Sequence, residues 1–317
     1  MRHDRDDEAL LTRAAWLYYV QDLVQEEIAR RLGCSRTKVV RLLARARERG
    51  LVRIELKSPF GACFELESRL KERFGLRDAV VVPTGRDESI NKTGIAKAAA
   101  LFLERSFRDR DIVGAGWGTT VYEVGQQLGP VKSSDLTLVQ LMGGINAATG
   151  PLNPLEVVKL LATRIGARGL WLNTPLVVDS PEIKEALLSD EGVRRVLEMA
   201  KSVNIALVGI GSVGPGCSLA ACQVLRAETV VQLMGRGAVG DILGQFFDRQ
   251  GRPVRSGVEE RMMAFPIGGL SAIPVVVGVA GGTAKIEAVL GALRGGFVNV
   301  LVTDEATAQA ALAMAAG

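Results

Sequence analysis

Short apolar runs alternate with helix-like segments along most of this chain of 317 residues, and this rhythm limits its fold more than any other feature. The helix-like segments cover residues 93–107, 156–165, 183–200 and 285–293. Continuous apolar strands that alternate with helices predict a mostly parallel sheet covered on both faces, in a Rossmann-like α/β domain. The expected strands, short and rich in β-branched residues, are 79–82, 112–115, 136–141, 170–172, 205–208, 275–279 and 298–302.

The first 57 residues follow a helical period instead. Helices are expected at 8–22 and 25–32, after which Gly33 can take the left-handed conformation that ends a helix. Ser35 is a suitable N-cap for a third helix. The apolar face expected for that helix, at positions i, i+3, i+4 and i+7, consists of Val39, Leu42, Leu43 and Ala46. Two short helices joined by a glycine turn predict a helix-turn-helix, whose second helix enters the DNA major groove.

Apolar and charged residues alternate at 51–57, which predicts a short strand like the wing of a winged helix. We therefore expect an all-α, winged helix-turn-helix DNA-binding domain at residues 1–57. An α/β effector-binding and oligomerisation domain is expected at 58–317.

The net charge of +4 is concentrated on the proposed DNA reader. Residues 25–57 carry ten Lys or Arg and four Asp or Glu, a charge of +6. Residues 1–24 carry three Lys or Arg and five Asp or Glu, a charge of −2. Residues 58–317 carry 26 of each sign. Because cations displace the counterions condensed on DNA, this distribution favours a DNA contact over a merely solvated helix face. The candidate DNA-binding residues are Gln25, Ser35, Arg36, Thr37, Lys38 and Arg41.

Several chemistries are disfavoured by residues that the chain lacks. His3 is its single histidine and lies near the N-terminus, so we expect no His-dependent hydrolase or metalloenzyme site and no catalytic residues. Cys34, Cys63, Cys217 and Cys222 fit no zinc spacing and predict reduced thiols in the cytoplasm. No apolar run approaches the roughly 20 residues that span a bilayer. We expect no metal, no cofactor and no membrane contact.

Glycine-rich segments follow several of the expected strands, at 114–120, 142–144, 209–212 and 278–285. In an open α/β sheet, ligands bind beyond the carboxyl ends of the strands, and glycine lets backbone N–H groups approach an anion. One such cluster would mark only a tight turn, but several in succession predict the rim of a pocket. The candidate effector-binding residues are Gly116, Gly118, Thr119, Thr120, Gly143, Gly144, Gly211, Asp241 and Lys285.

Three kinds of side chain in this rim suit a phosphorylated ligand, and each has a plainer explanation. Thr119 and Thr120 open a helix, where N–H groups and hydroxyls can bind phosphate, although Thr120 could simply cap that helix in a capping box. Lys285 could reach a phosphate or lie solvated at a helix start. Asp241 could accept hydrogen bonds from sugar hydroxyls, or be a helix-start acid, since 237–243 suggest a glycine turn and an apolar helix.

Residues 209–214 also match the G-x-G-x-x-G fingerprint of dinucleotide-binding proteins. However, Pro215 and Gly216 interrupt the place where the cofactor helix should continue. The first acid about twenty residues on, Glu228, precedes an apolar run instead of ending one. We therefore expect no dinucleotide.

Short segments in order through nearly the whole chain carry a resemblance to one known family. They are Leu-Tyr-Tyr at 17–19, Gln-Glu-Glu-Ile-Ala at 25–29, Ser-Arg-Thr-Lys-Val at 35–39, Arg-Leu-Leu at 41–43, Gly-Trp-Gly-Thr-Thr at 116–120, Val-Gly-Ile-Gly at 208–211, Gly-Ala-Val-Gly-Asp-Ile at 237–242, Phe-Phe-Asp at 246–248, Val-Ala-Gly-Gly-x-x-Lys at 279–285 and Leu-Val-Thr-Asp at 301–304. The chain resembles the SorC-type sugar-binding transcriptional regulators of bacteria, nearest to the Lsr-repressor-like branch. One departure is Val24, where the family commonly has a Thr that can cap the second helix.

The resemblance implies an effector domain similar to sugar-phosphate isomerases, glucosamine-6-phosphate deaminase and CoA transferases, without their chemistry. It implies phosphorylated sugars or sugar derivatives as effectors, and a homo-oligomer, usually a tetramer, on double-stranded operator DNA. By motif position, Thr119, Thr120 and Lys285 would hold phosphate and Asp241 would hold hydroxyl groups.

The leading hypothesis is a transcriptional regulator, a repressor, whose effector favours an oligomer arrangement that no longer matches the operator spacing. The alternative is a sugar-phosphate isomerase or deaminase-like enzyme that carries a DNA-binding domain, because function resides in the site and not in the fold. A constitutive architectural DNA-binding protein is a third possibility, but it would leave the glycine rim unexplained.

Overall fold

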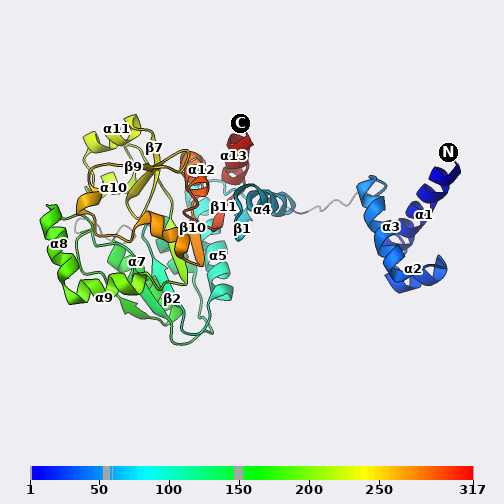
Figure 1. The fold of residues 1–317 in the computed structure, drawn as a ribbon, viewed down its shortest axis with the longest axis horizontal. Coiled ribbons are helices and arrows are strands. Elements are labelled where there is room, and N and C mark those ends of the chain that lie inside the picture. The colour runs from blue at the N-terminus through cyan, green and yellow to red at the C-terminus, as the bar shows by residue number, and fades with distance from the viewer. Residues whose placement is uncertain (1, 53–57, 59, 146–152, 317) are drawn as a thin grey trace. The chain divides into compact units, whose positions relative to one another are not determined.

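The computed structural model describes residues 2–52, 58, 60–145 and 153–316, with the backbone alone at residues 2–6. The chain divides into two compact units, residues 1–58 and 59–317 (Figure 1). Each unit has a hydrophobic core of its own.

Three helices make up the described part of the first unit. They are α1 (Arg2–Tyr19), α2 (Gln25–Arg31) and α3 (Arg36–Glu48). Gly33 has a φ of +60°, the left-handed conformation expected after α2. The Ser35 hydroxyl accepts a hydrogen bond from the backbone N–H of Lys38 at 3.2 Å, so the predicted N-cap of α3 is confirmed. α2 begins after Val24 without a side-chain cap, as the substitution of the family's Thr suggested.

α3 packs through the apolar face that its spacing predicted. Val39, Leu42, Leu43 and Ala46 are all buried and share one core with residues of α1 and α2. This face leaves the basic side chains of α3 on the surface. Residues 53–57 lie outside the described residues, so the wing strand expected at 51–57 stays a prediction.

A seven-stranded sheet, parallel throughout, forms the centre of the second unit. Its strands are β1 (Asp78–Val82), β2 (Ile112–Ala115), β3 (Thr137–Gln140), β4 (Arg168–Leu170), β5 (Ile205–Gly209), β10 (Val275–Val279) and β11 (Val300–Asp304). They lie in the order β1-β11-β10-β5-β2-β3-β4. Each of the seven apolar runs in the sequence forms a strand within two residues of its expected position.

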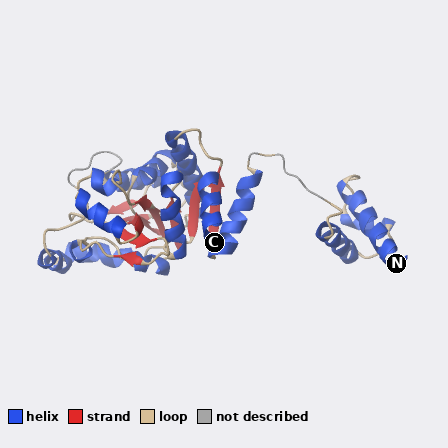
Figure 2. Cartoon of the chain, turned by 90° about the horizontal axis from the view of Figure 1, so that it is seen from above, coloured by secondary structure: helices blue, strands red, loops and turns tan. Residues whose placement is uncertain are grey.

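Helices cover both faces of this sheet, and Figure 2 shows strands of the unit lying between helices. Along β5, Ile205 and Leu207 belong to one hydrophobic cluster, whereas Ala206 and Val208 belong to the other. Alternate residues of a strand point to opposite faces, so both faces of the sheet are buried. This explains why the strands read as continuous apolar runs.

The helices of the second unit are α4 (Gly61–Phe74), α5 (Glu88–Ser106), α6 (Thr119–Gln127), α7 (Pro154–Ile165), α8 (Pro181–Ser189), α9 (Glu191–Ala200), α10 (Ser218–Ala221), α11 (Ala227–Gly235), α12 (Ile286–Arg294) and α13 (Glu305–Ala316). The single helix expected at 183–200 is two helices. Asp190 has an extended backbone that ends α8, and its side chain accepts a hydrogen bond from the N–H of Val193 at 3.0 Å to cap α9.

A second, antiparallel sheet corrects the helix expected at residues 237–243. Its strands, in spatial order, are β6 (Gly211–Ser212), β7 (Ala238–Ile242), β8 (Gln245–Asp248) and β9 (Pro253–Val254). β7 and β8 are joined by Leu243 and Gly244, with φ values of +53° and +77°. Positive φ at both central residues is the geometry of a type I′ hairpin turn, which the Leu-Gly pair concealed. Asp241 therefore lies on a strand and not at a helix start.

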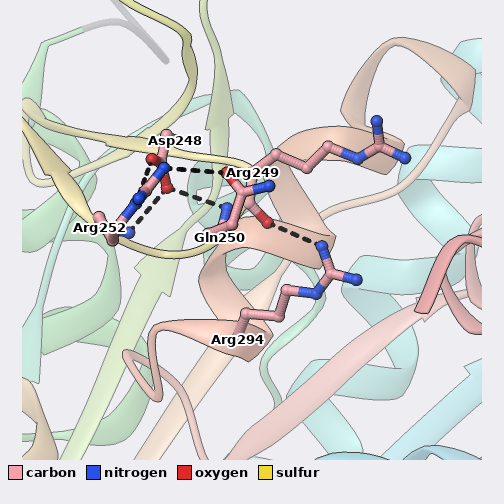
Figure 3. A network of polar contacts seen from close by, with 5 residues as sticks. All are labelled: Asp248, Arg249, Gln250, Arg252 and Arg294. Atoms are coloured by element: carbon pink, nitrogen blue, oxygen red, sulfur yellow. Dashed lines mark hydrogen bonds and ion pairs between the residues drawn. The ribbon is translucent and has the colours of Figure 1, made fainter. Parts of the chain in front are cut away.

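The turn between β8 and β9 is fixed to the end of α12 (Figure 3). One Asp248 carboxylate oxygen accepts hydrogen bonds from the backbone N–H groups of Gln250 and Arg252, each at 2.9 Å. The other accepts from Nε of Arg252 at 2.8 Å. Arg294 of α12 donates to the carbonyl oxygen of Arg249 at 3.3 Å. Because Lys285 directly precedes α12, this turn links the strands beside Asp241 to the helix that follows Lys285.

Candidate functional site

A cavity of about 280 Å³ lies where three neighbouring strands of the large sheet end. Its walls include the segments after β2, β5 and β10, the first turns of α5, and part of β7. These three strands are adjacent in the sheet, so their carboxyl ends meet at one edge, the position expected for a ligand. The volume is near the lower end of the range, roughly 300–1,000 Å³, that is typical of small-molecule sites.

The N-terminus of α6 reaches this cavity without a side-chain cap. Gly118 is its N-cap residue, at a φ of +124° that strongly favours glycine, and no side-chain hydrogen bond caps the helix. The capping box considered for this helix is not formed, because Glu123 accepts hydrogen bonds from two other side chains instead. Uncapped N–H groups beside the hydroxyls of Thr119 and Thr120 are suited to an anion.

Asp241 and Lys285, which are 44 residues apart in the sequence, both line the cavity. Asp241 is only 9% exposed and accepts a hydrogen bond from the backbone N–H of Gly244 at 3.2 Å. Lys285 is half-buried, and its Nζ donates to the carbonyl oxygen of Ile210 at 2.9 Å. A carboxylate and an ammonium group in one cavity can bind both hydroxyl groups and an anion.

Burial dominates the ionisation of this pair. It raises the pKa of Asp241 to about 6, against the opposing effect of the Lys285 charge. Burial also lowers the pKa of Lys285 from its ordinary value, against the opposing effect of Asp241. Shifts of this kind, caused by desolvation in a cavity that also holds a charged partner, are typical of functional sites.

Gly211 makes room for the Asp241 carboxylate. The two residues are paired across β6 and β7, and a Cβ atom on Gly211 would overlap a carboxylate oxygen of Asp241. Gly211 belongs to the segment that matched the dinucleotide fingerprint. The residues after Gly211 continue a short strand and a turn to α10, so the cofactor helix of that fingerprint is not formed.

The remaining glycine candidates lie elsewhere. Gly116 is buried beneath Leu243, where an added Cβ would lie 2.9 Å from a Leu243 methyl group, so it supports the cavity wall without lining it. Gly143 and Gly144 do not line this cavity. Their N–H groups bind the carbonyl oxygens of Met263 and Thr174, each at 2.7 Å. A position near the end of β3 therefore did not predict a place in the cavity. The cavity lies at the ends of β10, β5 and β2, and β3 is the next strand on the far side of β2.

Polar side chains outside the candidate effector-binding residues also line the cavity. They include Glu88, Asn91, Lys92, Ser212 and Ser218. Lys92 lies in the first turns of α5, and its Nζ is 3.8 Å from a carboxylate oxygen of Glu88. α5 follows β1, whose own carboxyl end has no glycine cluster to draw attention to it.

Asp304 has a structural role next to the cavity. It is fully buried and accepts hydrogen bonds from the N–H and hydroxyl of Thr307 and from the N–H of Gly282. These bonds hold the pKa of Asp304 below its usual value in spite of its burial. The carboxylate caps α13 and fixes the loop that leads to Lys285.

The first unit presents its candidate DNA-binding residues together. Ser35, Arg36, Thr37, Lys38 and Arg41 are exposed at or near the start of α3, and Gln25 of α2 accepts a hydrogen bond from Nε of Arg36 at 3.3 Å. Toward the end of α3, Arg45 and Arg49 form ion pairs with Asp7 at 2.6 and 3.6 Å. Among the described residues, Lys38 and Arg41 have no such ion pair, so their charges remain available to a polyanion.

Comparison with known proteins identifies the family. Residues 58–313 match the Sugar-bind family of sugar-binding domains. The chain is 35% identical to the deoxyribonucleoside regulator of Bacillus subtilis (strain 168), over 97% of this chain and 98% of that protein. It is 35% identical to the transcriptional regulator LsrR of Escherichia coli (strain K12), over 96% of this chain and 95% of that protein. The chain belongs to the SorC family of sugar-binding transcriptional regulators.

A solved structure of the SorC family agrees with this fold. The full-length sorbitol operon regulator SorC from Klebsiella pneumoniae has a TM-score of 0.75 and 30% sequence identity to the chain, over 96% of this chain and 99% of that one. These SorC-family relatives are all named as regulators, which supports a regulatory role here. Among the helices that the structure describes, none is both long and apolar enough to cross a membrane.

Proposed function

We propose that this chain is a DNA-binding transcriptional repressor whose effector is a phosphorylated sugar or sugar derivative. The observation that carries the proposal is the cavity itself, where an uncapped helix N-terminus, a lysine and a buried carboxylate meet. The Thr119 and Thr120 hydroxyls, the N–H groups of α6 and the Lys285 ammonium suit a phosphate group. The Asp241 carboxylate suits the hydroxyl groups of a sugar, because an ionised carboxylate only accepts hydrogen bonds.

We propose that α3 is the recognition helix of a winged helix-turn-helix at residues 1–57. Its exposed N-terminal half carries Arg36, Lys38 and Arg41, and arginine or lysine in this position can contact guanine or phosphate. Gln25 and Ser35 flank that surface, and Thr37 lies within it. Residues 58–317 would then form the effector-binding and oligomerisation domain of a cytoplasmic homo-oligomer, which we propose to be a tetramer on paired half-sites.

The test separates DNA binding from effector binding. In the variant Arg36→Ala/Lys38→Ala we expect operator binding to be lost, because two charged contacts to DNA are removed. Stabilisation by sugar phosphates in a thermal-shift screen should persist, since both substitutions lie outside the second unit. Lys97→Ala, an exposed lysine of α5, is the matched control. Unchanged gel shifts with the double variant would overturn the assignment of α3.

We propose that the chain performs no catalysis, although its effector domain resembles sugar-phosphate isomerases and glucosamine-6-phosphate deaminase. The shifted pKa values of Asp241 and Lys285 follow from burial, which outweighs the opposing effect of their mutual charge, and they suit binding as well as proton transfer. Turnover assays with ribose 5-phosphate and glucosamine 6-phosphate test this directly. Multiple turnovers of either substrate would show an enzyme instead.

A further inference from the structure

We propose that Lys92 is a second cationic contact for the ligand's anionic group, so that two lysines bind one dianion in the cavity. The proposal rests on the proposed function, because it names a further specificity-determining residue of the same pocket. It narrows the ligand class to compounds with a doubly charged group, such as a phosphate monoester, over neutral sugars and singly charged sugar acids.

The position of Lys92 is the first support. It projects from α5 into the lining of the cavity that also contains Lys285, Thr119 and Thr120, although α5 and α12 are far apart in the sequence. Its side chain is 30% exposed, so its charge is partly shielded from solvent. Burial is the main cause of the lowered pKa of Lys285, and the charge of Lys92 acts in the same direction.

The balance of charges is the second support. Two cations that share a cavity repel each other. An anion bound between them attracts both cations, and these two attractions offset the repulsion. Within the described residues, the one ion-pair partner of Lys92 is Glu88, at 3.8 Å and with 89% of its side chain exposed. A surface pair of this kind contributes little free energy. Lys92 can therefore leave Glu88 for a phosphate, which carries a charge of about −1.5 to −2 and three acceptor oxygens.

The geometry assigns different parts of the ligand to different groups. The N–H groups of α6 and the two threonine hydroxyls can bind one side of a phosphate, while Lys92 and Lys285 supply charge. Lys285 lies beside Asp241, so it also adjoins the region suited to sugar hydroxyls. Among the residues that the structure describes, Lys92 forms an ion pair with Glu88 and none with Asp241, so its contribution should follow the charge of the anion.

Isothermal titration calorimetry on the full-length chain at pH 8 tests the proposal, because phosphate is then a dianion and Asp241 is ionised. The probes are inorganic phosphate, ribose 5-phosphate and unphosphorylated ribose, at constant ionic strength. Lys92→Gln should weaken the binding of inorganic phosphate and ribose 5-phosphate about tenfold, which is the effect of losing one charge-assisted contact. Lys97→Gln, on the exposed face of α5 away from the cavity, is the control and should stay within about twofold of wild type.

A second variant tests the competition with Glu88. Glu88→Gln frees Lys92 and should strengthen phosphate binding about two- to threefold, and this gain should vanish when Lys92→Gln is also present. The proposal is overturned if Lys92→Gln binds phosphate as tightly as Lys97→Gln does. Failure of the wild-type chain to bind any phosphorylated probe would instead remove the proposed function itself, and the role of Lys92 with it.

Discussion

At the scale of single residues, the ionisation of Asp241 makes the stability of the protein depend on pH. Its pKa is about 6 in the folded protein and 3.8 ordinarily, so the folded state holds this proton more tightly. Between these values the free energy of unfolding must fall as pH rises, and above about 6 this contribution is constant. The whole change is at most about 3 kcal/mol, since one pKa unit corresponds to about 1.4 kcal/mol.

Asp241→Asn removes the carboxyl group that binds this proton. We expect the difference in unfolding free energy between variant and wild type to move in favour of the variant by up to about 3 kcal/mol between pH 4 and pH 7. Urea unfolding at half-unit pH steps measures it, and other groups cancel because both proteins share them. Parallel stability curves for the two proteins would contradict the raised pKa.

Gly211 offers a second test at the same scale. In Gly211→Ala the new methyl group would overlap the Asp241 carboxylate and must displace it. We expect sugar-phosphate affinity to fall about tenfold or more, because a displaced carboxylate loses its hydrogen bonds to the ligand. Gly214→Ala is the matched control, since a Cβ there meets nothing within 4 Å. Equal affinities in calorimetry for the two variants would show that Asp241 does not contact the effector.

Single residues of the site were predictable where a local rule applied. Thr119, Thr120, Gly211 and Lys285 line the cavity because parallel strands bring their carboxyl ends to one edge. Asp241 also lines the cavity, but it does so from β7 of the small sheet and not from the helix start that the sequence suggested. Lys92 could not be found in this way. It lies on a helix whose relation to the cavity depends on strand order, and strand order is not visible in one sequence.

At the scale of elements, the turn between β8 and β9 should be important for stability. Asp248→Ala leaves the N–H groups of Gln250 and Arg252 without this acceptor, and it removes the ion pair with Arg252. We expect the free energy of unfolding to fall by about 2–4 kcal/mol. Arg252→Ala keeps the carboxylate on the backbone N–H groups, and it should cost about 1 kcal/mol or less because its side chain is 74% exposed. Denaturant unfolding measures the loss of unfolding free energy in both variants. Similar losses in Asp248→Ala and Arg252→Ala would contradict this prediction.

The elements themselves were predicted unequally. Strands of the large sheet are buried on both faces, so their sequences are apolar throughout and easily recognised. The small sheet was missed because β7 contains glycine and aspartate and ends in a Leu-Gly turn. Gly240 within β7 would bring a Cβ atom to 2.7 Å from the Cβ of Ala288, so glycine there reflects close packing against α12 and not a helix start.

At the scale of the whole molecule, one chain contains a unit with a basic helix and a unit with the cavity that we propose binds an anion. The order of the units, the parallel sheet and the glycine-rich strand ends were readable from the sequence, because each follows from a local period or composition. The strand order of the sheet was not, since many orders satisfy the same periods. We propose that effector binding changes DNA binding by shifting the populations of assembled states.

The most direct test of this coupling is fluorescence anisotropy of a labelled DNA fragment from upstream of the protein's own gene, titrated with full-length chain. We expect at least one sugar phosphate from a broad panel to weaken wild-type binding about tenfold or more, a coupling of about 1.4 kcal/mol. Lys285→Met should bind the fragment as tightly as ligand-free wild type does, and the sugar phosphate should not weaken this binding. Wild-type affinity that no sugar phosphate changes, or an undiminished response of Lys285→Met, would contradict control of DNA binding by this cavity.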